Sequence, residues 1–491
     1  MASPYDLRIA IIGAGMGGLG CALSLAKKGF KHIAVYESAA DLGFVGAGIQ
    51  MAPNMARILD RLGCWADIEK EATNVQETSI RQGSTDKELA HVDMSGIRAL
   101  YEYPHCTGHR SSLAGGMYKA CLAEPAIEFH FSTALIGIDQ FEPRPILRLQ
   151  KRAPKVSSRA NGSSSASSAS GANGANSANG ANGSDITQNE AAEDAPPTSL
   201  EVDVLLGADG IKSLTRDTML SVLGLSTEEA DTGQASYRIM LTRDQMEAAG
   251  DAEMMQLLDS DCVVRWIGER RHIIAYPVAG KTVYNLSSAQ PDVNFAAAPS
   301  ATYTTRGSKS AMLHVFADFC PLVQRMLNMV PEGEVCEWRL RQHRELPMWV
   351  HGSVALLGDA CHPTLPHLSQ GAAMAIEDGA VLAEVLSRVQ VGDTDTDTSS
   401  RIRRCLKTYE LLRKERTSML VDMAYHSGRA LHLGEGAARE ERDRQFAAHR
   451  ADGKKAIPDK WASPDVQKMI YSYDCVAETN EEFDKLYATV V

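Results

Sequence analysis

The sequence lacks several features that would assign it to a specialised class of protein. No uninterrupted apolar run of about 18 residues occurs, so no segment is expected to span a bilayer. The ten cysteines form no CxxC pair and no framework of short spacings, which predicts free thiols in a reducing, cytoplasmic compartment. Basic residues are fewer than acidic ones, 50 against 62, and form no cluster, which makes nucleic acid and anionic membranes poor candidate partners.

The overall composition is that of an ordinary globular protein. Hydrophobic residues make up 44% and charged residues 23% of the 491 positions, close to the usual ~45–50% and ~25%. At roughly 100–200 residues per domain, this length predicts several domains with a large core. The apolar run at residues 9–25 could pass for a signal peptide, but its many glycines and the lack of a cleavage signal favour another role.

The first forty residues predict a strand, a turn, a helix and a second strand. Residues 7–12 form a short apolar run, GAGMGG follows at residues 13–18, residues 19–28 are typical of a helix, and residues 32–36 are a second strand-like run. This order is typical of a parallel βαβ unit, and such units build α/β domains around a mostly parallel sheet.

Residues 156–199 differ in kind from the rest of the chain. They are rich in Ser, Ala, Gly and Asn, with almost no large apolar side chain. Such a segment cannot bury enough surface to offset the entropy of ordering, which predicts a disordered insertion. Because the flanking residues 145–149 and 200–206 both look like strands, we interpret the insertion as an enlarged hairpin loop.

Residues 232–346 predict an antiparallel sheet covered by helices. A helix is expected near residues 308–328, together with four strand-like runs at 236–241, 262–267, 272–277 and 282–286. A strand at 353–357 and a helix near 371–389 follow. A second low-complexity patch at 392–400 then precedes a long amphipathic helix expected over 401–433.

The glycine-rich turn carries the first chemical signal. Gly13, Gly15 and Gly18 form a GxGxxG pattern between a strand and a helix, and Glu37 follows 22 residues after Gly15. The pattern indicates a dinucleotide site, with the pyrophosphate at the helix N-terminus and the acid on the ribose hydroxyls. A free ribose suits FAD or NAD. The alternative is a glycine-rich turn that only packs two elements, with a solvated Glu37.

Two later motifs also follow predicted strands. GADGIKS at residues 207–213 places Asp209 after one strand, and GDACHP at residues 358–363 places Asp359 after another. Gly371 then begins a helix, whose N-terminal N–H groups suit a developing anion. No metal site is predicted.

The three motifs occur in the order typical of a known family, and most of residues 7–430 resemble the single-component FAD-dependent aromatic hydroxylases. Within that family the chain is similar to salicylate hydroxylase and to the fungal flavoprotein monooxygenase 3-methylorcinaldehyde hydroxylase. The resemblance implies an α/β fold with a Rossmann-like FAD-binding domain, an antiparallel-sheet substrate domain and a C-terminal helical segment. The expected boundaries are 6–76, 105–231 and 347–390 for the FAD-binding domain, 77–104 and 232–346 for the substrate domain, and 400–491 for the helical region.

The resemblance also implies a role for each matching residue. Gly13, Gly15, Gly18 and Glu37 match the ADP-binding fingerprint. The other matches are Gly48 in the loop over the flavin, Arg110 of HRSSL contacting the cofactor, Asp209 where FAD and the nicotinamide cofactor meet, Asp359 on the ribityl hydroxyls, and the N–H groups of Gly371 and Ala372 beside the flavin's pyrimidine edge.

The sequence departs from the family pattern in two places. Gly115 and Gly116 are poor helix formers, which leaves the start of the helix after Arg110 open. Cys361 stands where the family usually has alanine, so a thiol is expected near the flavin. His362, between that cysteine and a proline, is interpreted as a structural histidine rather than a catalytic base.

Arg238 and Tyr276 are the candidate catalytic residues. In related phenol hydroxylases, an arginine and a tyrosine from the corresponding strands hold the substrate's oxygens. Because side chains alternate along a strand, Tyr237 and Arg238 must point to opposite faces of the sheet. The alternative makes Arg238 a surface or ion-paired residue and Tyr276 a core residue.

The resemblance implies a monooxygenase that uses NADPH or NADH to reduce FAD. O₂ would then give a flavin hydroperoxide that hydroxylates an electron-rich phenol, with decarboxylation or dearomatisation left open. The expected partners are a small aromatic substrate and O₂, and a homodimer is one open oligomeric state. The alternatives are a flavin-dependent epoxidase of an isoprenoid or other secondary-metabolite olefin, and a catalytically silent nucleotide-binding regulator. A halogenase is disfavoured because WxWxIP is missing.

Overall fold

The computed structural model describes residues 3–43, 47–153, 194–293, 304–451 and 457–490. The predicted N-terminal βαβ unit is present: β1 (Arg8–Ile12) leads into α1 (Met16–Lys28), and β2 (His32–Tyr36) lies parallel to β1. The helix begins three residues earlier than predicted, despite its glycines. A Cβ at Gly17 would lie 3.2 Å from Ala375 of α11 (Gly371–Leu386), so the glycine allows the two helices to pack closely.

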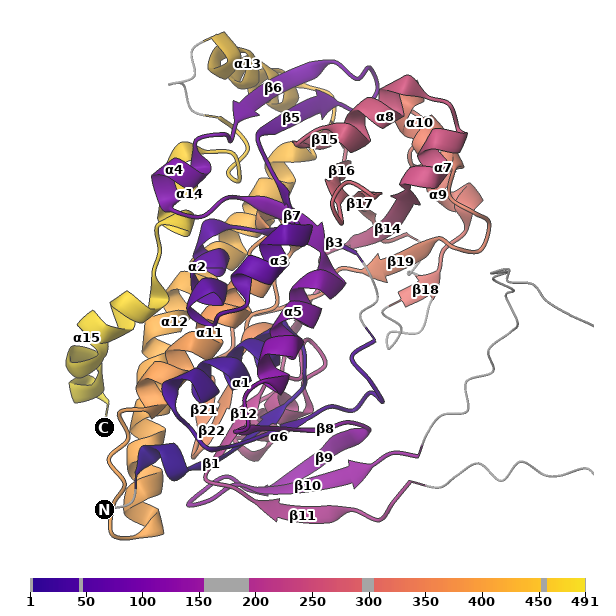
Figure 1. The fold of residues 1–491 in the computed structure, drawn as a ribbon. Helices are drawn as coiled ribbons and strands as arrows, with labels where there is room; N and C mark the ends of the chain where they lie inside the picture. The colour runs from indigo at the N-terminus through magenta and orange to yellow at the C-terminus, as the bar shows by residue number, and fades with distance from the viewer. Residues whose placement is uncertain (1–2, 44–46, 154–193, 294–303, 452–456, 491) are drawn as a thin grey trace, which may run out of the picture.

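The three motif-bearing strands lie side by side in one six-stranded sheet. Its order is β21 (Val350–His351), β22 (Val354–Leu356), β12 (Val204–Gly207), β1, β2 and β8 (Ile127–His130), and all neighbours are parallel except β21 and β22. Because parallel strands end at the same edge, the turns after β1, β12 and β22 meet there. Around this sheet lie α1, α11, α5 (Arg110–Leu122) and the long α12 (Asp395–Leu431) (Figure 1).

The segment around the insertion corrects one sequence prediction. Residues 200–206 form not one strand but parts of two, β11 (Thr198–Glu201) and β12, which belong to different sheets. β11 pairs antiparallel with β10 (Ile146–Lys151), which pairs with β9 (Thr133–Gln140). The strands that flank the insertion are therefore neighbours, as expected for a hairpin. Most of the insertion itself, residues 154–193, lies outside the described residues.

The second large sheet has eight strands. Its order is β18 (Thr304–Arg306), β19 (Cys336–Arg339), β14 (Gln234–Thr242), β17 (Val283–Pro291), β16 (Arg271–Val278), β15 (Cys262–Gly268), β5 (Glu77–Gln82) and β6 (Glu88–Asp93). The pairing is antiparallel, as predicted, except that β5 and β15 run parallel. The strands from residues 77–93 thus extend the sheet formed by residues 234–339.

Helices cover one face of the eight-stranded sheet. These are α7 (Arg243–Ala248), α8 (Ala252–Asp259), α9 (Lys309–Val315) and α10 (Pro321–Asn328). Their apolar side chains form a core with those of the sheet, including Trp266 and Phe316. The single helix predicted over residues 308–328 is two helices, because the first ends before Phe316 and Pro321 begins the second.

The C-terminal region contains one further correction. α12 begins at Asp395, inside the patch predicted to precede it, because the Thr394 side chain accepts a hydrogen bond from the backbone N–H of Asp397 and caps the helix. Beyond α12 lie α13 (Ala437–Ala451), α14 (Pro464–Tyr471) and α15 (Cys475–Thr489). Among the helices of the described ranges, none combines the length and apolar composition needed to cross a membrane.

Smaller elements join the two sheets. A three-stranded sheet has the order β3 (Gly48–Met51), β7 (Cys106–His109) and β4 (Thr73–Asn74), and β13 (Glu229–Ala230) pairs with β20 (Gln342–His343). The remaining helical elements are α2 (Pro53–Arg61), α3 (Trp65–Glu71), α4 (Ile97–Tyr101), α6 (Leu214–Val222), η1 (Pro4–Asp6), η2 (Gly358–Ala360) and η3 (Pro366–Leu368).

Candidate active site

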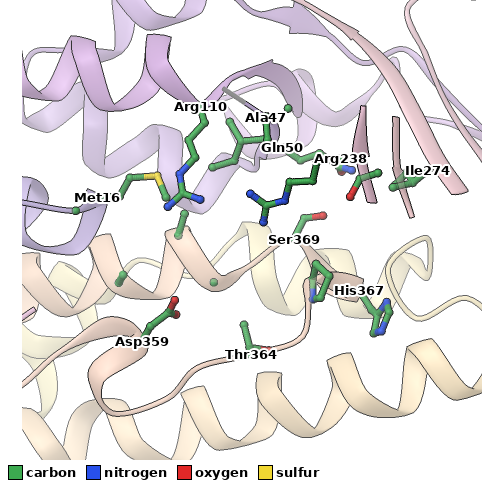
Figure 2. Close-up of a pocket in the computed structure, with 18 of the residues that line it drawn as sticks. Met16, Ala47, Gln50, Arg110, Arg238, Ile274, Asp359, Thr364, His367 and Ser369 are labelled. Atoms are coloured by element: carbon green, nitrogen blue, oxygen red, sulfur yellow. The ribbon is translucent and has the colours of Figure 1, made fainter. Parts of the chain in front are cut away.

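An elongated cavity of about 370 Å³ begins at the turns after β1, β12 and β22 and extends to the eight-stranded sheet. Figure 2 shows Met16 and Asp359 towards one end, Ile274 and His367 towards the other, and Arg110 and Arg238 between them. We call the part lined by Gly15, Met16, Gly17, Ala208, Gly210 and Asp359 the cofactor end, and the part lined by Gln50, Arg265, His272, Ile274 and His367 the inner end.

Most of the predicted site residues line this cavity. The lining residues among them are Gly15, Gly48, Arg110, Arg238, Tyr276, Asp359, Gly371 and Ala372. Four others, Gly13, Gly18, Glu37 and Asp209, do not line the cavity. Residues predicted from separate motifs therefore converge on one space.

The glycines of the first turn serve different purposes. Gly13 has φ +99°, and a Cβ there would lie 2.5 Å from the Ala208 carbonyl oxygen; a Cβ on Gly18 would lie 2.0 Å from the Gly13 oxygen. Both are required by packing within the protein. At Gly15, by contrast, a Cβ would meet no atom within 4 Å, and the residue faces the cavity at the N-terminus of α1. Such an open cradle beside free helical N–H groups fits a dinucleotide pyrophosphate.

Glu37 is joined to the glycine turn. Its carboxylate accepts hydrogen bonds from the backbone N–H of Ala14, at 2.9 Å, and of Ala39, at 2.8 Å. These bonds fix the acid at the end of β2 beside the turn. Its predicted bond to ribose hydroxyls stays a prediction.

Asp209 turns away from the cavity. Its oxygens accept hydrogen bonds from Ser213 Oγ at 2.5 Å and from the N–H and hydroxyl of Thr215 at 3.0 and 2.9 Å, at the start of α6. Burial raises the pKa of this carboxyl, and these bonds oppose the rise. Its neighbours Ala208 and Gly210 line the cavity instead. The role of Asp209 in cofactor binding therefore also stays a prediction.

Gly48 and Arg110 are brought together by the pairing of β3 with β7. Gly48 pairs with His109, and Arg110 follows directly at the start of α5, with its guanidinium in the cavity (Figure 2). The departure at Gly115 and Gly116 does not delay this helix, which begins at Arg110. A Cβ on Gly48 would lie 2.6 Å from the Tyr276 ring, so the glycine is required by the close approach of β3 to β16.

Asp359, Gly371 and Ala372 line the cavity from the segment after β22. The Asp359 carboxylate points into the cavity (Figure 2), where burial raises its pKa and the charges of His362 and Arg110 oppose the rise. Gly371 is the first residue of α11, so the positive end of that helix dipole faces the same space.

A buried ionic network fixes this segment. Asp378 of α11 accepts hydrogen bonds from the Gly358 N–H at 2.9 Å, from His362 Nε2 at 2.6 Å and from Arg413 Nε of α12 at 2.8 Å. Burial alone would raise the pKa of Asp378, but His362 and Arg413 lower it to about 2. Cys361, His362 and Asp378 are close enough to hold a metal ion, yet the carboxylate is already bonded, and His362 has the structural position expected for it.

The two candidate catalytic residues lie between the ends. Arg238 on β14 and Tyr276 on β16 line the cavity, whereas Tyr237 is buried in the opposite core, as the strand alternation predicts. The Arg238 guanidinium lies 4.6 Å from the centre of the Trp338 ring. Burial, and secondly the charge of Arg110, lowers the pKa of Arg238, while burial raises the pKa of Tyr276.

The inner end contains residues that the sequence argument did not single out. Arg265 and His272 lie on predicted strands, and His367 is part of η3. One signal was present: a charged residue inside an otherwise apolar strand, such as Arg265 in CVVRWIG, requires a partner. That partner is distant in sequence, so its identity could not be read from the strand itself.

Known proteins resemble this chain over most of its length. The FAD binding domain family matches residues 6–424. The FAD-dependent monooxygenase OpS4 of Beauveria bassiana (strain ARSEF 2860) is 28% identical over 475 residues, 96% of this chain and 96% of that protein. The 3-hydroxybenzoate 6-hydroxylase 1 of Aquipseudomonas alcaligenes is 29% identical over 432 residues, 88% of this chain and 91% of that protein. A solved salicylate hydroxylase substrate complex has the same fold, with a TM-score of 0.69 at 22% identity, covering 99% of this chain and 98% of that one.

Proposed function

The chain belongs to the FAD binding domain family, and from that premise we propose that it hydroxylates an electron-rich phenolic substrate with NADH or NADPH as the electron donor. The expected resemblance to FAD-dependent aromatic hydroxylases is confirmed, and the protein is an FAD-dependent monooxygenase. The substrate, the choice of nicotinamide cofactor and any accompanying decarboxylation belong to the proposal.

The residues at the cofactor end fit FAD. The open cradle at Gly15 and the N-terminus of α1 would hold the pyrophosphate, and the Asp359 carboxylate would accept hydrogen bonds from ribityl hydroxyls. The N–H groups of Gly371 and Ala372 would face the flavin ring at the positive end of α11. When bound, FAD supplies the redox chemistry with O₂ and the nicotinamide cofactor.

One observation carries the proposed substrate class: two guanidinium groups, Arg110 and Arg238, enter the cavity without a carboxylate partner. Within the described residues, neither takes part in an ion pair. Arg110 is exposed and Arg238 half-buried, so the cost of a cation without compensation falls mainly on Arg238. A phenolate oxygen beside Arg238 would supply the missing negative charge, and the Tyr276 hydroxyl could donate a further hydrogen bond to it. Holding the substrate as its phenolate makes the ring more electron-rich and hence easier to hydroxylate.

Two residues of the wall beside this position are buried. Tyr276 is 5% exposed, and Asn285 beside it is 1% exposed and accepts a hydrogen bond from the Gly48 N–H at 2.8 Å. This contact holds β3 against β16 and β17. A buried wall strengthens the attraction between Arg238 and a phenolate. The same proposal places the enzyme in the cytoplasm, which the ten free cysteine thiols support.

The proposal is tested by offering the FAD-loaded enzyme a panel of phenols with NADH or NADPH. We expect at least one phenol to accelerate nicotinamide oxidation and to gain one oxygen atom by mass. Arg238→Ala and Tyr276→Phe should keep FAD, because the fit to FAD rests on other residues, but lose product by about 10²-fold and release peroxide instead.

A matched control is Arg243→Ala, which removes an arginine of the same sheet region whose Nη2 bonds Asp259 at 2.5 Å on the surface. It should keep product formation per nicotinamide consumed. Wild-type coupling in both the Arg238 and the Tyr276 variant would contradict their proposed roles. An olefin turned over in place of every phenol would contradict the substrate class.

A further inference from the structure

Polar residues in the wall of the inner end are bonded from behind by the C-terminal segment, which we define as residues 432–451 and 457–471. Arg265, His272 and Gln50 line the cavity. Each is connected, directly or through one residue, to a side chain of this segment. The segment lies beyond residue 424, where the match to the FAD binding domain family ends. The inner end is therefore completed by a part of the chain outside that match.

The first connection is a buried ion pair. Arg265 Nη1 lies 2.8 Å from Asp459 Oδ2, and the two side chains are 4% and 0% exposed. Asp459 is held in turn by the Trp461 N–H at 3.1 Å. The centre of the Trp461 ring lies 5.7 Å from the Arg265 guanidinium carbon. The charge of Arg265 is thus already compensated before any substrate enters.

The second connection joins two histidines. His272 Nδ1 lies 2.7 Å from Nε2 of His432, at the end of α12. Burial lowers the pKa of His432 to about 4 and that of His272 well below its usual range. His367 beside them has its pKa lowered to about 3 by burial. All three imidazoles are consequently neutral at physiological pH.

The third connection is a chain of hydrogen bonds. The Tyr471 hydroxyl lies 3.2 Å from His105 Nδ1, and His105 Nε2 lies 3.1 Å from the side-chain oxygen of Gln50. His105 is fully buried, and burial lowers its pKa to about 3, so the ring is neutral. This chain engages the Gln50 oxygen with His105 and so fixes the orientation of the Gln50 side chain in the wall.

These connections give the cavity an uneven charge. Between the two ends, Arg110 and Arg238 have no carboxylate partner among the described residues. At the inner end, Asp459 neutralises Arg265 and the histidines are neutral. An anionic substituent placed there would approach an arginine whose charge is already balanced, while losing its own hydration.

We propose that the C-terminal segment is a specificity-determining layer of the active site, and that Asp459, by balancing Arg265, selects substrates whose inner portion is polar but uncharged. This inference rests on the proposed function, since it takes the substrate's anionic oxygen to lie beside Arg238. Asp459 and His432 touch no substrate themselves. They act as positioning residues through Arg265 and His272.

The test uses two probes of nearly equal size, 5-hydroxyisophthalate and its monoamide, which differ by one charge. Their dissociation constants from the FAD-loaded enzyme are measured by the change in flavin absorbance. We expect wild type to prefer the monoamide. Asp459→Asn leaves Arg265 without a counter-charge, so the ratio of the two constants should move towards the dicarboxylate by at least about tenfold. An unchanged ratio in Asp459→Asn would overturn the proposal.

A second variant covers the possibility that an unpaired buried arginine prevents folding. Arg265→Met combined with Asp459→Asn removes both charges, so it should keep the wild-type preference for the monoamide. A shift of this double variant towards the dicarboxylate would mean that loosened packing, not charge, sets the ratio, and would overturn the proposal.

The matched control is Asp474→Asn. Asp474 also lies in the C-terminal region, but its carboxylate bonds Arg61 at 2.7 Å on the surface, and neither residue lines the cavity. It should leave the ratio unchanged. FAD content and phenol-stimulated nicotinamide oxidation are recorded in parallel. If they are normal while the ratio fails to shift, the specificity layer is refuted and the proposed function stands; if no phenol stimulates oxidation, the proposed function itself fails.

Discussion

The two ends of the cavity are built in opposite ways. The cofactor end consists mainly of backbone: glycine turns and helix N-termini that follow β1 and β22, each within a few consecutive residues. The inner end consists of single side chains from β3, β15, β16 and η3, supported from behind by residues near the end of the chain. A short motif can specify backbone geometry on its own. A set of side chains acquires its neighbours only when the whole chain is folded.

The largest expected effect concerns the cofactor end and uses two glycines of the same turn. Gly15 has φ −70°, which any residue can adopt, and its missing side chain leaves open space. Gly15→Val should therefore fold but lose its bound FAD, because the new side chain fills the cradle. The flavin absorbance of the purified protein and its melting temperature are the measurements.

Gly13→Ala provides the contrast. At φ +99° and with its Cβ 2.5 Å from the Ala208 oxygen, this substitution should lower the free energy of unfolding, by at least about 1–3 kcal/mol. If Gly15→Val is yellow at wild-type stoichiometry, the cradle does not hold the cofactor, and the two glycines do not differ in the way described.

The sequence could predict features of the cofactor end more readily than those of the inner end. The GxGxxG turn, the acid after β2 and the glycine that begins α11 were all identified, because each belongs to a short local motif directly after a strand or at a helix start. The orientation of Asp209 was not, because only the fold shows that Ser213 and Thr215 engage both its oxygens.

The partners at the inner end were beyond sequence reasoning. Arg265 and Asp459 are separated by most of the C-terminal half of the chain, and no spacing rule connects them. The predicted start of α12 was wrong for a different reason. The Asp- and Thr-rich residues 394–397 were interpreted as low-complexity, although the same residue types cap helices, as Thr394 does here.

A smaller effect is expected at the inner end from Tyr471→Phe. The ring stays in the core, but the hydroxyl that holds His105, and through it Gln50, is lost. One hydrogen bond contributes about 1 kcal/mol, so the dissociation constant of the best phenol should rise by roughly fivefold, while FAD content stays normal.

Tyr103→Phe is the matched control for that variant. Its hydroxyl bonds Asp60 at 2.8 Å on the surface, so its loss should leave phenol affinity as in wild type. Equal effects of the two substitutions would show that Tyr471 acts through general stability rather than through Gln50.

The smallest expected effect lies outside both ends. Lys151 and Ala195 are joined by a backbone hydrogen bond of 3.0 Å, and the Ala153 N–H bonds Asp194 at 2.8 Å, so the base of the hairpin is closed by its own contacts. Removing residues 158–190 should leave FAD content unchanged and the melting temperature within about 2 °C. A marked loss of either would show that the insertion contributes to one of the two ends.

The order of strands in the six-stranded sheet has a consequence for folding during translation. β1 is synthesised before the other strands of this sheet. β22 lies two places from β1 in the sheet but is formed by residues 354–356. Arg413, which bonds Asp378 and so helps to fix the loop after β22, is made later still. At about 5–20 residues per second, roughly 20–70 s of translation separate the first strand from the last. β12 is made before β22, and for roughly 7–30 s of translation at that rate its apolar edge has no partner from β22. The cofactor pocket is therefore completed only after residue 413 has been made, well after its first glycine turn.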